Sequence, residues 1–160
     1  MDIFDEELLK FWRSLIINNV RFVMIGGVAT NLHGYHRTTN DIDLWIEDTL
    51  SNRKQLRIAF KEYGIGDFSS LETLQFVAGW TTFRLDNSLE IDIMTSVKGL
   101  EEFSFDESYQ LASFADIFDI NVPFLHINQL IASKKAANRP KDQIDVIELE
   151  KIKKLREEEE

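Results

Sequence analysis

The sequence contains no cysteine and only two prolines among its 160 residues. Without cysteine the chain can form neither a disulfide nor a thiolate zinc site. No run approaches the roughly 18 apolar residues of a membrane-spanning helix. The start, MDIFDEELLK, is acidic, whereas the first part of a signal peptide is basic. We therefore expect a soluble, cytoplasmic protein with no membrane partner.

Basic residues are also scarce, because 18 lysines and arginines face 28 acidic residues and the net charge is -10. A protein that coats nucleic acid needs a basic surface, so this class is disfavoured, although a local basic patch can still bind a nucleotide or a tRNA end. A hydrophobic content of 44%, with 12 phenylalanines, excludes a disordered chain. We expect one domain over residues 1–155 and an acidic, frayed tail over residues 156–160.

Two carboxylates stand out at the start of an apolar run. Asp41 and Asp43 flank Ile42, and a strand directs residues i and i+2 to the same face. The two carboxylates therefore project together while Ile42 points into a core. Like charges at this separation repel each other unless a cation lies between them, and hard oxygen ligands of this kind suit Mg²⁺. The pattern predicts a divalent-metal site.

A pair of glycines precedes these carboxylates. Gly26 and Gly27 follow the apolar run of residues 22–25 directly. A Gly-Gly turn has no side chains to block a phosphate, and the helix that we expect next would direct its N–H groups toward that phosphate. We interpret the two glycines as a phosphate-binding turn.

A third carboxylate is expected from a hairpin with strands at residues 81–85 and 89–94 and a turn at 86–88. Aspartate is depleted in strands, yet Asp92 lies between two isoleucines in the second of these strands. We assign Asp92 to a catalytic triad with Asp41 and Asp43. Glu90 shares the face of Asp92 and is the alternative third carboxylate.

The motifs Ile25-Gly26-Gly27 and Asp41-Ile42-Asp43 resemble the signature of the nucleotidyltransferase superfamily, which has the polymerase-beta-like fold. The Gly-Gly form is most similar to small stand-alone bacterial and archaeal enzymes, including toxins of abortive-infection type. The resemblance implies an α/β fold with a mixed, twisted sheet and helices mainly on one face. It also implies two Mg²⁺ ions, replaceable by Mn²⁺, on Asp41, Asp43 and Asp92.

The function implied by this resemblance is transfer of a nucleoside monophosphate from an NTP, with ATP favoured, to a hydroxyl group. Asp92 would help to deprotonate that hydroxyl, and pyrophosphate would leave. The acceptor is a tRNA end, a protein or a small molecule, and an antitoxin or a dimer partner is a further expectation. The alternative is a non-catalytic module that binds a nucleotide or a protein partner.

One dense basic cluster occurs in this acidic chain, in the segment KKAANRPKD. Such a cluster favours a phosphate partner, and by the resemblance Lys134 or Lys135 reaches the triphosphate. A polynucleotide acceptor or a solvated helix end are the alternatives. The members of the cluster are Lys134, Lys135, Arg139 and Lys141.

Three other residues near these motifs carry charge. Arg37 precedes the aspartates and either contacts phosphate or braces its loop. Asp142 and Asp145 are expected to cap the last helix and pair with basic neighbours.

Trp45 and Trp80 are expected in the core. Hydrophobic periodicity predicts helices at residues 5–18, 27–33, 53–63, 128–138 and 140–155 and strands at residues 21–25, 41–46, 109–120 and 122–127.

Overall fold

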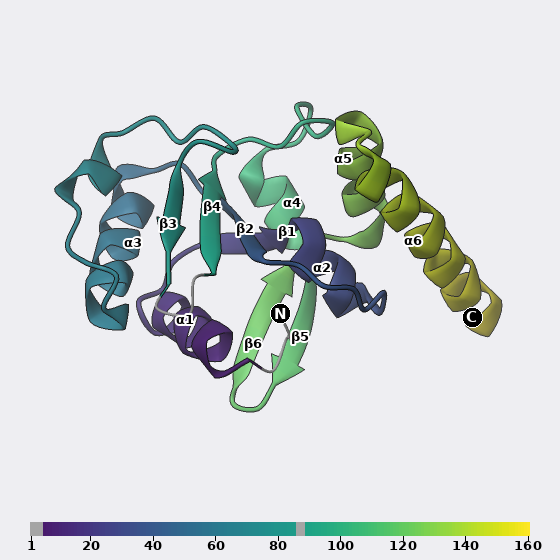
Figure 1. The fold of residues 1–160 in the computed structure, drawn as a ribbon, viewed down its shortest axis with the longest axis horizontal. Coiled ribbons are helices and arrows are strands. Elements are labelled where there is room, and N and C mark those ends of the chain that lie inside the picture. Colours follow the sequence, from purple (N-terminus) through teal and green to yellow (C-terminus); the bar gives the residue numbers. More distant parts are fainter. Residues whose placement is uncertain (1–4, 86–88) are drawn as a thin grey trace.

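The computed structural model describes residues 5–85 and 89–160, so the expected turn at residues 86–88 lies outside the described residues. The chain forms a six-stranded mixed sheet with helices packed around it, which confirms the α/β class (Figure 1). The strands are β1 (Phe22–Ile25), β2 (Asp41–Ile46), β3 (Thr82–Arg84), β4 (Glu90–Met94), β5 (Ser113–Ile117) and β6 (Ile120–Phe124). The helices are α1 (Glu6–Ile17), α2 (Gly26–His33), α3 (Leu50–Tyr63), α4 (Phe105–Leu111), α5 (Ile127–Ala137) and α6 (Pro140–Glu159), with a 3-10 turn, η1 (Ser69–Glu72).

The strand order is β3-β4-β2-β1-β6-β5. The central strand β2 runs antiparallel to β1 and parallel to β4. Strands in the middle of a sheet are covered on both faces, which explains why β1 is fully buried and reads as a continuous apolar run. This arrangement fixes the ends of β1, β2 and β4 next to one another.

Helix α1 covers one face of the central strands. Its Trp12 donates the indole N–H to the sulfur of Met24 at 3.2 Å, and Met24 is the register partner of Leu44 on β2. Phe11 packs edge-on against Tyr63 of α3, with ring centroids 5.7 Å apart. These large side chains anchor α1 and α3 to each other and to the sheet.

Helix α4 lies on the opposite face, since Trp45 follows Leu44 on β2 and packs edge-on against Phe105. The prediction of a strand over residues 109–120 was wrong at both ends. Helix α4 continues to Leu111 and β5 begins only at Ser113, and β5 ends at Ile117, whereas Ile120 already belongs to β6. The late start of β5 is caused by a capping box. The side chain of Ser104 accepts the backbone N–H of Glu107, and the side chain of Glu107 accepts the backbone N–H of Ser104, which nucleates a helix here.

Helix α3 begins at Leu50, earlier than the expected Arg53, because Thr49 accepts the N–H of Asn52 at 3.1 Å and is the N-cap. The Asn52 side-chain amide bonds the backbone of Arg21 through both its oxygen and its nitrogen, at 2.7 and 2.9 Å. It therefore ties the start of α3 to the strand β1.

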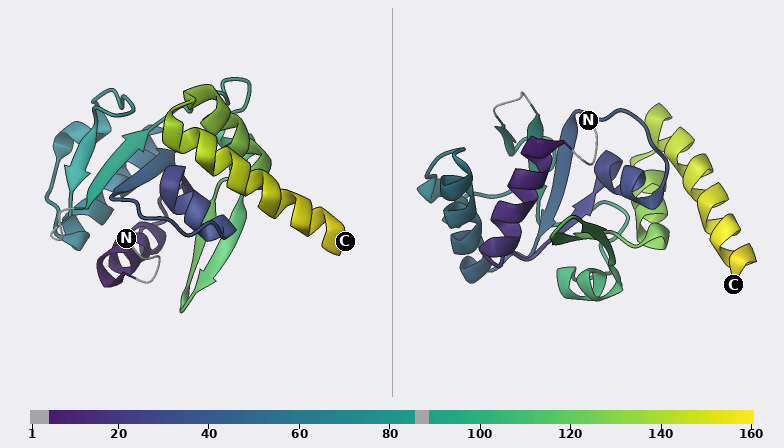
Figure 2. Two further views of the ribbon diagram at one scale, coloured as in Figure 1. Left: turned by 45° about the vertical axis from the view of Figure 1, so that its right-hand side comes forward. Right: turned by 90° about the horizontal axis from the view of Figure 1, so that it is seen from below.

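Helices α5 and α6 pack together at one end of the molecule (Figure 1). Helix α6 runs to Glu159, so the expected end at Leu155 was wrong and the acidic tail is largely helical. Both views of Figure 2 show the C-terminal part of α6 extending past the rest of the molecule. In the part of the chain that is described, no helix is long and apolar enough to cross a membrane.

Candidate active site

Three aspartates come together at the junction of β2 and β4. Asp43 is the direct register partner of Asp92 across the parallel strands, and Asp41 is the partner of Glu90. The three aspartates line a cavity of about 430 Å³ between the sheet and the α5–α6 pair. Other residues that line it are Gly26, Ala78, Gly79, Ser96, Lys98, Ser133, Lys134, Arg139, Lys141 and Asp142.

Glu90 is held differently from Asp92. Its carboxylate pairs with Arg84 on β3 at 3.1 Å, in an exposed position, whereas Asp92 lines the cavity and accepts the N–H of Gly79 at 2.8 Å. This placement favours Asp92 over Glu90 as the third carboxylate of the site.

Gly26 makes the close approach of Asp43 possible. Its φ is +67°, a conformation that residues with a Cβ rarely adopt, and a Cβ at this position would lie 2.1 Å from the Asp43 Oδ2. The Asp43 carboxylate therefore lies directly against the backbone at the start of α2. A group bound to the Asp43 carboxylate would also be next to the first turn of this helix.

Gly27 packs against the loop before β2. A Cβ on Gly27 would lie 2.8 Å from the hydroxyl of Thr39 and 3.3 Å from Arg37 Nη1. Gly27 thus lets the loop before β2 pack closely on α2, and it is not among the residues that line the cavity.

The electrostatics of the carboxylates reflect their crowding. The pKa of Asp43 is raised to about 6, mainly by burial and then by the charges of Asp92 and Asp41, while Lys134 and Lys141 oppose the rise. Burial also raises the pKa of Asp92; the hydrogen bond from Gly79 works against this and the charge of Asp41 adds to it. The Asp92 Oδ1 is buried and has no hydrogen-bond partner among the described residues.

The site fits a hard divalent cation by its donor chemistry. Within residues 5–85 and 89–160, no three histidine, cysteine, aspartate or glutamate side chains form a ready-made metal site. The unpartnered Asp92 Oδ1 nevertheless needs a ligand, and Asp43 gains from any positive charge placed near it. A cation bound by Asp41, Asp43 and Asp92 would satisfy both needs.

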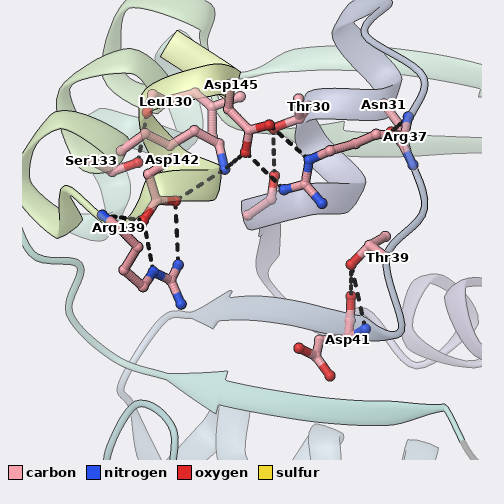
Figure 3. Close-up of polar contacts among 12 residues, drawn as sticks. Thr30, Asn31, Arg37, Thr39, Asp41, Leu130, Ser133, Arg139, Asp142 and Asp145 are labelled. Carbon is pink, nitrogen blue, oxygen red and sulfur yellow. Dashed lines mark hydrogen bonds and ion pairs between the residues drawn. The ribbon is translucent and has the colours of Figure 1, made fainter.

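A buried ion-pair network joins the loop before β2 to α5 and α6 (Figure 3). Asp145 on α6 is fully buried and accepts two bonds of 2.7 Å from the Arg37 guanidinium and one of 2.8 Å from Lys134. Burial would raise the pKa of the Asp145 carboxyl, but the hydrogen bonds from Arg37 and Lys134 outweigh it and hold this pKa below its usual range. Asp142 continues the network, since it pairs with Arg139 at 2.7 Å and lies 3.7 Å from Lys134.

The network contains three of the residues considered in the sequence, namely Arg37, Asp142 and Asp145. Arg37 braces its loop against α6 and does not line the cavity. The Asp142 carboxylate accepts the backbone N–H of Arg139 at 3.1 Å and so caps the start of α6, and both aspartates pair with basic neighbours as predicted.

The basic cluster divides into cavity-facing and outward residues. Lys134 lines the cavity but is only 4% exposed and is held by Asp145. Lys141 is exposed and lines the cavity. Lys135 is instead paired with Glu150 of α6 at 3.5 Å, in an exposed position.

Sequence reasoning missed the turn at residues 77–81 and the cation of Lys98. Gly79 has a φ of +79° and binds Asp92, so its turn forms one wall of the cavity. The neighbouring Trp80 was expected in the core, which is wrong: it is 85% exposed. Trp45 is buried as expected. Isolated glycine and lysine residues in an irregular segment carried no signal that could have identified this wall.

With this geometry in place, comparison with known proteins is informative. Residues 5–158 match a family described as a nucleotidyltransferase of unknown function (DUF6036). The chain belongs to this family. No curated protein matches the sequence.

Several solved structures share the nucleotidyltransferase fold. The lincosamide antibiotic adenylyltransferase LnuA, bound to lincomycin, aligns with a TM-score of 0.63 at 13% identity, over 95% of this chain and 99% of its own. The enzyme ANT(2")-Ia, in complex with adenylyl-2"-tobramycin, aligns with a TM-score of 0.59 at 18% identity, over 93% and 92%. An antigenic nucleotidyltransferase-like protein from Paracoccidioides brasiliensis aligns with a TM-score of 0.54 at 16% identity, over 89% and 72%.

The network predicts a large stability effect at Asp145. In Asp145→Asn, the charges of Arg37 and Lys134 lose their buried partner, so the free energy of unfolding should fall by about 3–5 kcal/mol. Urea denaturation followed by circular dichroism measures this. Glu150→Gln, which removes the exposed pair with Lys135, is the control and should change the free energy of unfolding by about 0.5 kcal/mol or less. Equal effects of the two changes would contradict the role of the network.

The raised pKa of Asp43 predicts a pH dependence of stability in metal-free protein. Since this pKa rises from 3.8 to about 6 on folding, the folded state holds a proton that the unfolded chain has released. The free energy of unfolding should therefore fall as the pH rises from about 4 to about 6. Asp43→Asn should remove this component and should be more stable at neutral pH by up to about 3 kcal/mol.

The measurement is urea denaturation in the presence of a chelator at a series of pH values. Asp116→Asn, on the exposed surface of β5, is the matched control and should keep the wild-type pH profile. An Asp43→Asn profile that parallels wild type would show that the Asp43 carboxylate is not strained in the folded protein.

Proposed function

We propose that the protein is a Mg²⁺-dependent nucleotidyltransferase that transfers a nucleoside monophosphate from an NTP to a hydroxyl group of a small molecule. The observation that carries this proposal is the position of the Asp43 carboxylate, which lies against the backbone of Gly26 and beside Asp92. A metal-binding carboxylate group and a helix start able to bind phosphate thereby share one cavity.

The residues that would hold Mg²⁺ are Asp41, Asp43 and Asp92. Bound Mg²⁺ would neutralise the charge that builds up on the phosphates during transfer. The chain's own contribution is positioning: the register of β2 and β4 sets the separation of Asp43 and Asp92, and Gly79 fixes the orientation of the Asp92 carboxylate.

The reaction that we infer is a single displacement. The acceptor hydroxyl oxygen bonds to the α-phosphorus as the bond from that phosphorus to the β-phosphate oxygen breaks, and pyrophosphate leaves. The hydroxyl proton passes to the Asp92 carboxylate, which lines the cavity and is held in orientation by the N–H of Gly79. Lys141 and Lys98 supply positive charge at the exposed side of the cavity, where the triphosphate would lie.

The choice of a small-molecule acceptor rests on charge and on the relatives. A polynucleotide acceptor calls for many phosphate contacts from lysine and arginine, whereas this chain has a net charge of -10 and its cavity lies among four aspartates. The structures of similar fold include a lincosamide adenylyltransferase and an enzyme bound to an adenylylated tobramycin.

The test of the proposed function is incubation of the purified protein with each NTP, labelled at the α-phosphate, Mg²⁺ and a fractionated cell extract. We expect label in the small-molecule fraction and release of pyrophosphate. Label in RNA or protein would make the acceptor class wrong. No transfer into any fraction, with nucleotide binding retained, would instead support the non-catalytic alternative.

The first prediction from this proposal separates the two candidate third carboxylates. Asp92→Asn should lower turnover by two or more orders of magnitude with little change in NTP affinity, since it loses the base. Glu90→Gln, its matched neighbour on β4, should keep turnover close to wild type because Glu90 is paired with Arg84 outside the cavity. Turnover and nucleotide affinity are measured separately, and the opposite ranking would assign the role to Glu90.

The second prediction concerns the basic cluster. Lys141→Ala should weaken ATP binding by about ten- to a hundredfold, because a charge-assisted hydrogen bond is worth roughly 1.5–3 kcal/mol. AMP binding should change less, since AMP lacks the outer phosphates. Calorimetry with Mg²⁺ and no acceptor measures both affinities.

The matched control for Lys141 is Lys135→Ala, which removes the same charge a short distance away on a side chain paired with Glu150. It should leave both affinities unchanged. Equal losses for ATP and AMP in Lys141→Ala would show that Lys141 does not contact the outer phosphates.

A further inference from the structure

One face of α6 is exposed and carries large apolar side chains. Ile144, Ile147 and Leu155 are 54%, 57% and 59% exposed. Since each residue of an α-helix turns by about 100°, these three fall within one narrow sector. Figures 1 and 2 show that α6 lies on the outside of the molecule and that its C-terminal end projects away from it. The opposite side of the helix is buried through Asp142, Asp145 and Leu149.

Charged and apolar side chains recur on this face of α6 at a regular spacing. Six residues recur at alternating spacings of three and four, which is the spacing of a seam between two paired helices. In chain order they are Lys141, Ile144, Glu148, Lys151, Leu155 and Glu158.

Read in reverse, the same six residues are complementary to themselves. Lys141 and Glu158 are opposite in charge, as are Glu148 and Lys151, and Ile144 and Leu155 are both apolar. All three pairs are centred on one point of the helix, between Leu149 and Glu150, so a single register satisfies them together.

We infer that α6 binds α6 of a second copy of this chain in antiparallel orientation, with the two-fold axis between Leu149 and Glu150. Each of the three pairs then forms twice, as a two-fold interface requires. Ile144 and Leu155 make an apolar contact near each end, and Ile147 packs beside them. Glu148 and Lys151 of the two copies form ion pairs at the centre.

The charges also decide against the simplest other arrangement. In a parallel, in-register pair, Glu148 would face Glu148 of the second copy and Lys151 would face Lys151, and these like charges repel. The antiparallel register instead pairs opposite charges at every charged position of the seam. It also brings Glu158 of the second copy to Lys141, at the rim of the cavity. The interface is small, so we expect a weak dimer.

The experiment uses charge reversal and sedimentation of the full chain from low to high micromolar concentration. The wild-type protein should form a dimer as the concentration rises. Glu148→Lys places two lysine pairs at the centre of the interface and Lys151→Glu places two glutamate pairs there. Each variant alone should raise the dimer dissociation constant by about tenfold or more.

The decisive sample is an equal mixture of the two variants. In a dimer of one Glu148→Lys chain and one Lys151→Glu chain, the first chain has lysine at positions 148 and 151. These lysines face the glutamates at positions 151 and 148 of the second chain. The mixture should therefore recover a dimer of near wild-type affinity. Glu148 and Lys151 also form an ion pair of 3.2 Å within one helix. Both variants lack this pair, alone and in the mixture, so its return cannot explain a recovered dimer.

Lys54→Glu on the exposed surface of α3 makes the same charge change as Lys151→Glu and should leave the dimer intact. Circular dichroism checks that every variant keeps its helix content. A wild-type protein that stays monomeric at all concentrations overturns the inference. A mixture that fails to recover the dimer overturns it too, because it excludes this register. Either result leaves the proposed transfer reaction, measured separately, unaffected.

Discussion

The buried carboxylate of Asp145 is the interaction on which the arrangement of the site depends. It receives the Arg37 guanidinium from the loop before β2 and the Lys134 ammonium from α5, while it belongs to α6 itself. Three segments that are distant in sequence are thus fixed to one fully buried group. Removing one partner leaves uncompensated charge in the interior, which makes this geometry strongly specified.

The network also explains why so few of the basic residues are available to a ligand. Lys134 and Arg139 lie at the cavity but are already paired with Asp145 and Asp142. Their positive charges oppose part of the repulsion among the three aspartates of the cavity, as the effect of Lys134 on the Asp43 pKa shows. A phosphate ligand would then depend mainly on the backbone at Gly26 and on the exposed lysines of the rim.

The carboxylate cavity itself is a place where the chain stores unfavourable energy. Asp43 is half-buried next to two other aspartates, and one oxygen of Asp92 has no partner in the described residues. Stability alone would not select this combination, since a buried, unpaired carboxylate destabilises the folded state. Such clusters are typical of functional sites, and this agrees with the family to which the chain belongs.

The sequence by itself determined the α/β class and the pairing of Gly26 with Asp41 and Asp43, because these features depend on local spacing and on the two-residue period of strands. It also pointed to Asp92, an aspartate that lies between two isoleucines in a strand. Tertiary structure alone decided which cations face the cavity. Of the lysines in the basic segment KKAANRPKD, Lys141 lies at the cavity rim, whereas Lys135 is paired with Glu150. It likewise placed Arg37 on Asp145 and Trp80 in solvent. The reason is physical, since these outcomes depend on contacts between residues far apart in the chain, and no local periodicity encodes such contacts.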